Sequence, residues 1–149
     1  MIQRKQSLYL LMAVILLIFN LFNPFIKTEL VYFDAFKLTY SGADTMLNIS
    51  TYPLGIYLII VILLHLFTIF LFKNRRIQMR FTILSLLLAL GFYGLLLFYH
   101  FMSKGNIPLN FNMYSFGLVS PLLAAIFDFM AYGGIKRDEK LIRDAERLR

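Results

Sequence analysis

Cysteine is absent from the 149 residues of the sequence. A chain without a thiol cannot form a disulfide, a thiolate metal site or a cysteine nucleophile, so thiol redox chemistry is excluded. Charged residues are scarce as well, since Asp, Glu, Lys and Arg together make up only 15% of the chain. This is too little charge to cover the surface of a water-soluble domain of this length, which indicates that lipid is the surrounding solvent.

Familiar catalytic signatures are also missing. The sequence has no glycine-rich phosphate-binding loop, no nucleophile elbow and no His-Glu-x-x-His motif. Its two histidines, His65 and His100, lie in different apolar blocks and at different depths, so they do not predict a metal site. We therefore expect no enzymatic activity, no cofactor and no bound metal.

Long apolar runs dominate what is present. Hydrophobic residues make up 60% of the chain, and they fall into four blocks without a helical or strand rhythm. The blocks cover residues 8–26, 53–72, 80–102 and 113–135, and each can cross about 30 Å of hydrocarbon at about 1.5 Å per residue. The sequence therefore predicts an all-α membrane protein, in which a bundle of four transmembrane helices forms one domain over residues 1–149.

The first block has a second interpretation. Arg4 and Lys5 precede it, as basic residues precede the apolar core of a cleaved signal peptide. The residues that follow Phe19 do not offer the small side chains that a signal peptidase requires. We therefore favour a membrane span whose exit is marked by Asn23-Pro24, because proline lacks an N–H group and restricts the residue before it.

Lysine and arginine are unevenly divided between the connections. They gather before the first block, between the second and third blocks, and after the fourth block, whereas the opposite side has only Lys27, Lys37 and Lys104. The positive-inside rule then places both termini in the cytoplasm. The basic anchor on that side comprises Lys73, Arg75, Arg76, Arg80, Lys136 and Arg137.

The formal charge of +7 has two interpretations, nucleic acid or anionic lipid as the binding partner. The basic residues lie at the ends of apolar blocks, where lipid headgroups are already present. We therefore expect anionic headgroups at the cytoplasmic face as partners, and no nucleic acid.

The connection over residues 27–52 is the long outer loop of this arrangement. Aromatic and aliphatic residues recur in it at even positions, and Ser41-Gly42 is typical of a turn. This pattern predicts a small β-hairpin on the outer mouth of the bundle. The alternative is an irregular loop that rests its aromatic side chains on the membrane interface.

The segment of residues 136–149 alternates charges of both signs, which predicts a cytoplasmic helix that continues from the fourth block. Leu141, Ala145 and Leu148 share one face of this helix. Such a stripe is typical of a helix that lies on the lipid interface or docks on a partner, and also of an ordinary solvated helix end.

Two ionisable residues, His65 and Asp128, fall inside the apolar blocks, where a charge costs several kcal/mol unless it is paired or hydrated. Each lies about two helical turns before the inner end of its block, so we predict that they share a depth about 10 Å from the cytoplasmic boundary. One hypothesis is that they face each other or share a hydrated pocket. The competing interpretations are a structural hydrogen bond between helices and a pairing of Asp128 with the basic anchor.

The fourth block has a face of small and polar residues that predicts close helix packing. Pro121 lies on this face, and we expect it to bend the helix or to free a carbonyl group there. The residues of the face recur at three- and four-residue intervals and are Gly117, Pro121, Ala124, Ala125, Asp128 and Tyr132.

Three segments of the chain carry a resemblance to a known family. They are the opening Met1–Arg4 with Ser7–Leu11, the central Lys73–Arg80, and the closing Ile135–Ile142 with Arg147–Arg149. In these segments the chain resembles, over essentially its whole length, the small four-span membrane proteins of Bacteroidota grouped as domain of unknown function 4293. The resemblance implies the inner membrane of a Gram-negative bacterium. It implies no activity and no catalytic residue.

These observations predict a multi-pass inner-membrane protein that is not an enzyme. We expect a structural or partner-binding component that associates with another membrane protein or with a second copy of itself. The alternative is a small transporter or transporter subunit with its polar site at His65 and Asp128. A proton or ion relay usually needs more groups, and the apolar blocks contain no further acidic residue.

Overall fold

The computed structural model describes residues 5–41, 46–102 and 116–147, which form four helices and one antiparallel sheet. The helices are α1 (Lys5–Phe22), α2 (Tyr52–Phe70), α3 (Arg75–Met102) and α4 (Phe116–Arg147), with a 3-10 turn, η1 (Leu71–Lys73), between α2 and α3. The strands are β1 (Ile26–Lys27), β2 (Val31–Phe33), β3 (Lys37–Ser41) and β4 (Met46–Ser50).

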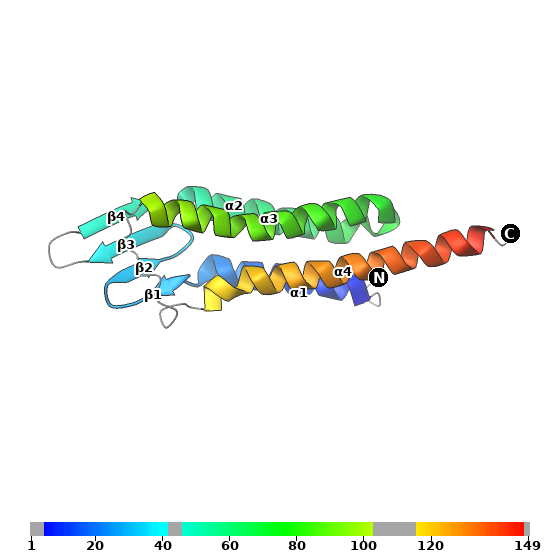
Figure 1. The fold of residues 1–149 in the computed structure, drawn as a ribbon, viewed down its shortest axis with the longest axis horizontal. Coiled ribbons are helices and arrows are strands. Elements are labelled where there is room, and N and C mark those ends of the chain that lie inside the picture. Colours follow the sequence, from blue (N-terminus) through cyan, green and yellow to red (C-terminus); the bar gives the residue numbers. More distant parts are fainter. Residues whose placement is uncertain (1–4, 42–45, 103–115, 148–149) are drawn as a thin grey trace.

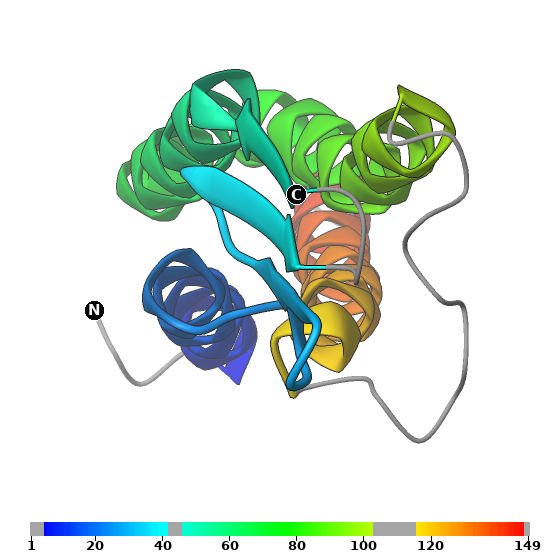
Figure 2. The same ribbon diagram turned by 90° about the vertical axis from the view of Figure 1, so that its left-hand side faces the viewer.

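The helices form an elongated bundle, with the sheet at one end and the C-terminal part of α4 at the other (Figure 1). Around the bundle axis each helix lies beside two others, in the order α1, α2, α3 and α4 (Figure 2). Within the described residues, all four helices are long and apolar enough to cross a membrane, as the sequence predicted. We call the half of the bundle next to the sheet the sheet-side half and the other the tail-side half.

The first helix ends earlier than the predicted block over residues 8–26. Pro24 cannot donate a hydrogen bond to continue the helix, and the Asn23 side chain donates to the Phe19 carbonyl oxygen at 2.8 Å, which satisfies the end of the last turn. Ile26 therefore belongs to strand β1 and not to the helix. The predicted start of the fourth block at residue 113 lies outside the described residues, and α4 is described from Phe116.

The sheet is a meander in which each strand pairs antiparallel with the next, in the order β1-β2-β3-β4. Val31 pairs with Tyr40, and Leu38 with Ile49. Val31, Phe33 and Leu38 are buried, whereas Tyr32 between them is exposed, which is the alternation of a sheet with one face on a core. The predicted hairpin corresponds to β3 and β4, and two shorter strands extend it.

The turn between β2 and β3 fixes the sheet to the start of α2. Oδ1 of Asp34 accepts the N–H groups of Phe36 and Lys37 at 2.8 and 2.6 Å, and the Thr51 hydroxyl donates to the Asp34 carbonyl oxygen at 3.1 Å. A Cβ atom at Gly55 would lie 2.5 Å from the ring of Phe36, so only glycine permits this approach. The sheet is therefore in direct contact with the first turn of α2.

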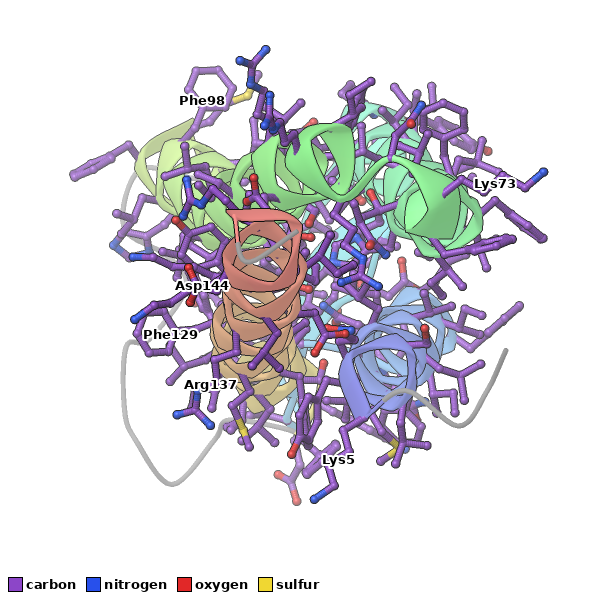
Figure 3. All side chains as sticks on the ribbon, turned by 90° about the vertical axis from the view of Figure 1, so that its right-hand side faces the viewer. Lys5, Lys73, Phe98, Phe129, Arg137 and Asp144 are labelled. Atoms are coloured by element: carbon purple, nitrogen blue, oxygen red, sulfur yellow. The ribbon has the colours of Figure 1, made fainter. Side chains whose placement is uncertain are left out.

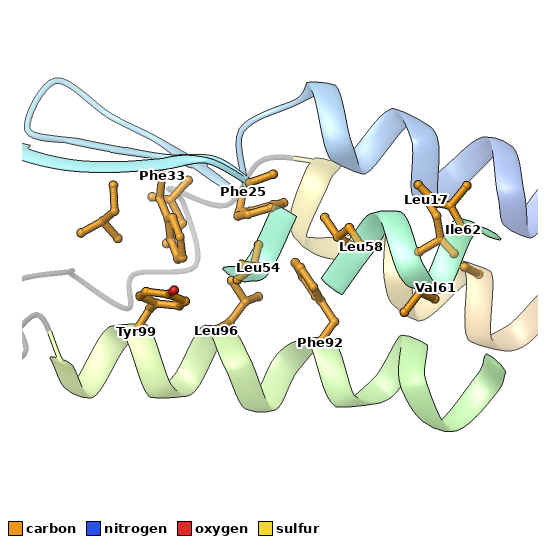
Figure 4. Close-up of a cluster of buried hydrophobic side chains, with 14 of the residues drawn as sticks. Leu17, Phe25, Phe33, Leu54, Leu58, Val61, Ile62, Phe92, Leu96 and Tyr99 are labelled. Atoms are coloured by element: carbon orange, nitrogen blue, oxygen red, sulfur yellow. The ribbon is translucent and has the colours of Figure 1, made fainter. Parts of the chain in front are cut away.

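The interior of the sheet-side half is mainly apolar. Aromatic rings meet there edge to face, with ring centroids 5.3 Å apart for Phe25 and Phe33 and 5.2 Å apart for Phe25 and Phe92. Phe33 also contacts Tyr99 at 6.2 Å. Figure 4 shows how these rings, with leucine and valine side chains of α1 and α2, fill the space between the helices and the sheet.

Helix α4 continues without a break from Phe116 to Arg147, so the predicted helical tail is present through residue 147. It extends beyond the ends of the other helices (Figure 1). Asp138 fixes its exit from the bundle, because its side chain accepts a hydrogen bond from Gln6 of α1 and its carbonyl oxygen accepts one from Arg75 of α3 at 2.8 Å.

Candidate functional site

The predicted pair, His65 and Asp128, meets inside the bundle. Nε2 of His65 lies 2.9 Å from Oδ2 of Asp128, and both side chains have 0% exposure. The residues lie on α2 and α4, which are opposite one another in the ring of helices, so their contact crosses the interior. The structure therefore brings together the two ionisable residues that the sequence placed at one depth.

The second ring nitrogen of His65 defines the protonation of the pair. Nδ1 lies 2.8 Å from the carbonyl oxygen of Val61, one helical turn earlier. A carbonyl oxygen only accepts, so Nδ1 carries a hydrogen, and the bond between Nε2 and Oδ2 requires one more hydrogen. Whether this hydrogen is placed on the imidazole or on the carboxyl group, the net charge of the pair is zero. Neutrality is what permits two such groups to be fully buried.

Further buried polar side chains of α2 and α3 lie in the same half of the bundle as this pair. Gln78 of α3 donates to the carbonyl oxygen of Thr68 of α2 at 3.1 Å, which joins the two helices. The hydroxyls of Thr68, Thr82 and Ser85 donate to carbonyl oxygens of their own helices at 2.8 to 2.9 Å. We call this set the polar layer, and its buried members are His65, Thr68, Gln78, Thr82, Ser85 and Asp128.

One acceptor in the polar layer is not satisfied. Oδ1 of Asp128 is buried and has no hydrogen-bond partner within the part of the chain that the structure describes. A carboxyl oxygen in this state can accept a hydrogen bond from a water or a ligand, and it is the clearest chemical capacity of the site.

Metal binding was not predicted, and no group of three or more His, Cys, Asp or Glu side chains that could hold a metal ion is found among the described residues. His100 lies in the last turn of α3, near the sheet, whereas His65 lies in the second half of α2, toward the tail. The two histidines therefore belong to different parts of the bundle.

Most of the polar layer was not predicted from the sequence. A signal for it is present, since Gln78, Thr82 and Ser85 recur at helical spacing on one face of an apolar helix. Tyr93 was not predicted either, and its hydroxyl donates to the Leu118 carbonyl oxygen at 2.7 Å and accepts the N–H of Leu122 at 3.1 Å. Tyr93 thus enters the hydrogen-bond ladder of α4 on both sides of Pro121.

Pro121 frees the carbonyl group that was expected. Its missing N–H would have bonded to the Gly117 carbonyl oxygen, which instead accepts the Ser120 hydroxyl at 3.2 Å. The predicted packing face of α4 is also present, with Gly117, Ala124 and Ala125 buried and Tyr132 half-buried.

The basic anchor lies at the end of the bundle opposite the sheet, which Figure 3 shows with Lys73 and Arg137 among its labelled residues. Arg75 is half-buried and bonded to α4, and the other five residues are exposed. Arg76 pairs with Glu139 of α4 at 3.2 Å. The anchor residues therefore come from η1, from the first turns of α3 and from the C-terminal part of α4, all at one end of the bundle.

Residues 2–148 match the family described as Domain of unknown function (DUF4293). The chain belongs to this family. The resemblance inferred from its opening, central and closing segments is thereby confirmed. No curated protein and no solved structure matches the chain. The DUF4293 description names no function, so family membership adds no reaction, ligand or partner.

Proposed function

We propose that this DUF4293 protein is an integral protein of the bacterial inner membrane, with both termini in the cytoplasm, and that it is a non-enzymatic scaffold that binds partners outside the bilayer. The observation that carries the proposal is the closed interior. Packed rings fill the sheet-side half, and the hydrogen bonds of the polar layer remain almost entirely within the bundle. Such an interior stabilises a shape and leaves the two ends for recognition.

The helix surfaces support a membrane location. Large apolar side chains point outward from every helix, and Phe67, Leu87 and Phe129 are 51%, 58% and 68% exposed. Water would penalise such a surface, whereas lipid does not. The exposed lysines and arginines at the tail-side end support the proposed orientation, because positive charge concentrates on cytoplasmic connections.

Membrane insertion and orientation can be tested with single cysteines, because the chain has none of its own. Glu29→Cys lies in the sheet region and Lys140→Cys in the tail, and both positions are exposed. A membrane-impermeant maleimide applied to intact spheroplasts is expected to label Glu29→Cys and to label Lys140→Cys only after permeabilisation. Leu87→Cys, on a lipid-facing surface, is the control that stays unlabelled. The opposite labelling order disproves the orientation, and labelling of Leu87→Cys in spheroplasts disproves insertion.

The scaffold role can be tested by photo-crosslinking in intact cells. A photoreactive amino acid at Tyr32 reports on the sheet, and one at Leu141 reports on the tail, where the native side chain is 69% exposed. We expect discrete adducts with a protein from at least one of these positions and none from the control position Leu87. Absence of adducts from both positions, in cells where the protein is present at its normal level, disproves the scaffold.

A small transporter or transporter subunit is the second candidate, and the unsatisfied Oδ1 of Asp128 favours it. On the tail side of His65, the buried side chains of Thr68 and Gln78 add further polar groups to the interior, as a path for protons would require. Proteoliposomes with an internal pH-sensitive dye separate the two candidates. If the protein is a transporter, the wild type shows a proton flux that Asp128→Asn removes and Tyr57→Phe leaves unchanged. If it is a scaffold, the wild type and both variants show the same proton leak.

A further inference from the structure

We infer that the groove between the turn after α2 and the C-terminal part of α4 binds the phosphate of an anionic phospholipid headgroup. The inference rests on the membrane location and orientation proposed above. It assigns a defined lipid site to what would otherwise be a general attraction of basic residues to the bilayer.

The groove has a volume of ≈ 480 Å³ and is formed by two separate segments. Lys73, Arg75 and Arg76 come from the turn and the start of α3, and Arg143 comes from α4. Glu139 is the one carboxylate in its lining. Four cations around one carboxylate leave an excess of positive charge, and a phosphate diester is the anion that such a fork of guanidinium groups fits best.

The guanidinium groups are held in place but still have donors to offer. Arg75 is fixed by its bond to the Asp138 carbonyl oxygen at 2.8 Å, which uses only Nη1. Arg76 uses Nε for Glu139 at 3.2 Å, so its two terminal nitrogens face outward on a side chain that is 82% exposed. The first turn of α3 also lines the groove and has no acidic residue, so its N–H groups add to the positive potential.

The same groove has an apolar side that favours a lipid over a soluble phosphate. Ile77 and Ile142 line it and are 41% and 44% exposed. The groove lies where α3 enters the proposed bilayer, so a lipid can place its phosphate among the cations while its glycerol and upper acyl carbons contact these isoleucines. A free phosphate ion would gain nothing from the apolar contact.

The test measures lipid binding to the full chain in neutral detergent by native mass spectrometry, with phosphatidylglycerol and phosphatidylcholine of the same acyl chains. The wild type is expected to bind phosphatidylglycerol at least tenfold more tightly than phosphatidylcholine. Arg76→Gln with Arg143→Gln is expected to reduce the affinity for phosphatidylglycerol about tenfold, because each basic residue near an anionic headgroup contributes severalfold. The control, Lys5→Gln with Lys27→Gln, removes the same charge from exposed positions outside both the groove and the basic anchor, and we expect a change below twofold.

A variant that binds the lipid more tightly than the wild type would show that the effects come from the site and not from damage to the fold. Glu139→Gln removes the carboxylate that competes with the lipid for Arg76, and we expect phosphatidylglycerol to bind severalfold more tightly. Equal losses of affinity for phosphatidylglycerol in the two double variants would mean that the general positive potential of the protein surface attracts the lipid. This result would overturn the inference. Displacement of the lipid by an equal concentration of glycerol 3-phosphate would identify a soluble phosphate site and also overturn it.

Alkaline extraction of membranes separates failure of the lipid site from failure of the membrane placement. A chain that stays in the membrane pellet and shows no preference for phosphatidylglycerol disproves the groove alone. A chain released into the supernatant disproves the membrane placement on which the groove depends.

Discussion

The two halves of the bundle are stabilised by different interactions. In the sheet-side half, rings and aliphatic side chains fill the interior, and the sheet packs on them. In the tail-side half, the polar layer occupies the space between the helices and joins α2 to both α3 and α4 by hydrogen bonds. Asn20 is an exception in the sheet-side half, since its buried amide atoms have no partner within the described residues.

This difference between the halves shows two kinds of interaction that can determine which helix faces pack together when the outer surfaces are apolar as well. In lipid, moving an apolar side chain from the surface to the interior gains little, so shape complementarity and hydrogen bonds decide the packing. The sheet-side half depends on shape, and we expect a lost ring to be costly there. The tail-side half depends on hydrogen bonds, which require a particular direction between donor and acceptor. We expect the loss of one such bond to lower the free energy of unfolding by less, and the losses on two bonded helices to be coupled.

The largest expected effect is in the sheet-side half. Phe92→Ala removes a ring with 0% exposure that contacts Phe25, and we expect a loss of about 3 kcal/mol in the free energy of unfolding. Unfolding by sodium dodecyl sulfate in mixed micelles, followed by circular dichroism, measures it. Phe98→Ala is the control on the same helix, where the ring is 60% exposed, and we expect a change below about 0.5 kcal/mol. Similar losses for both variants would contradict an interior held by shape.

The close approach of α4 to the segment that follows α1 gives the next effect. A Cβ atom at Gly117 would lie 2.6 Å from the Pro24 carbonyl oxygen, and backbone cannot move aside as a side chain can. We expect Gly117→Ala to cost about 2 kcal/mol by the same unfolding measurement. Gly94→Ala is the matched control, because nothing lies within 4 Å of its Cβ position, and alanine there should stabilise the helix by about 0.5 kcal/mol. A stabilising Gly117→Ala would show that the backbone at Pro24 does not contact α4 at this point.

Tyr93 gives a smaller effect at the proline of α4. Tyr93→Phe leaves the Leu118 carbonyl group and the Leu122 N–H without their shared partner, and we expect a loss of about 1.5 kcal/mol. Tyr57→Phe, which removes a bond of 2.6 Å to the Leu88 carbonyl oxygen in an uninterrupted helix, should cost less. In a Pro121→Ala background the ladder of α4 can close by itself, so the effect of Tyr93→Phe should fall by at least half. An unchanged effect of Tyr93→Phe in that background would show that the stabilisation by Tyr93 does not depend on Pro121.

The sequence predicted the helices well because apolar blocks and basic flanks are local signals. The ends of α1 and the two short strands were harder to predict. β1 has only two residues and β2 three, too few for an alternating pattern to be recognised, and both depend on pairing with β3. The position of Ile26 in a strand follows from that pairing and not from its own hydrophobicity.

The candidate site was predictable in depth but not in detail. His65 and Asp128 could be placed at one level because both helices run in the same direction from similar ends. The bond of His65 to the Val61 carbonyl oxygen, and the insertion of Tyr93 at Pro121, depend on helix rotation and on the register between neighbouring helices. Neither quantity is encoded in the spacing within a single apolar block.

The smallest predicted effect is the coupling between His65 and Asp128. It tests most directly whether hydrogen bonds distinguish the tail-side half from the sheet-side half. We expect His65→Ala and Asp128→Asn to be non-additive by about 1 kcal/mol, in the upper part of the range for hydrogen bonds between membrane helices, because both partners of this bond are fully buried. His65→Ala with Thr82→Ala is the matched pair from the same layer, and it should be additive because Thr82 bonds within its own helix. Additive losses for His65 and Asp128 would mean that the polar layer does not join α2 to α4. The contact between α2 and α4 at this level would then depend on packing alone.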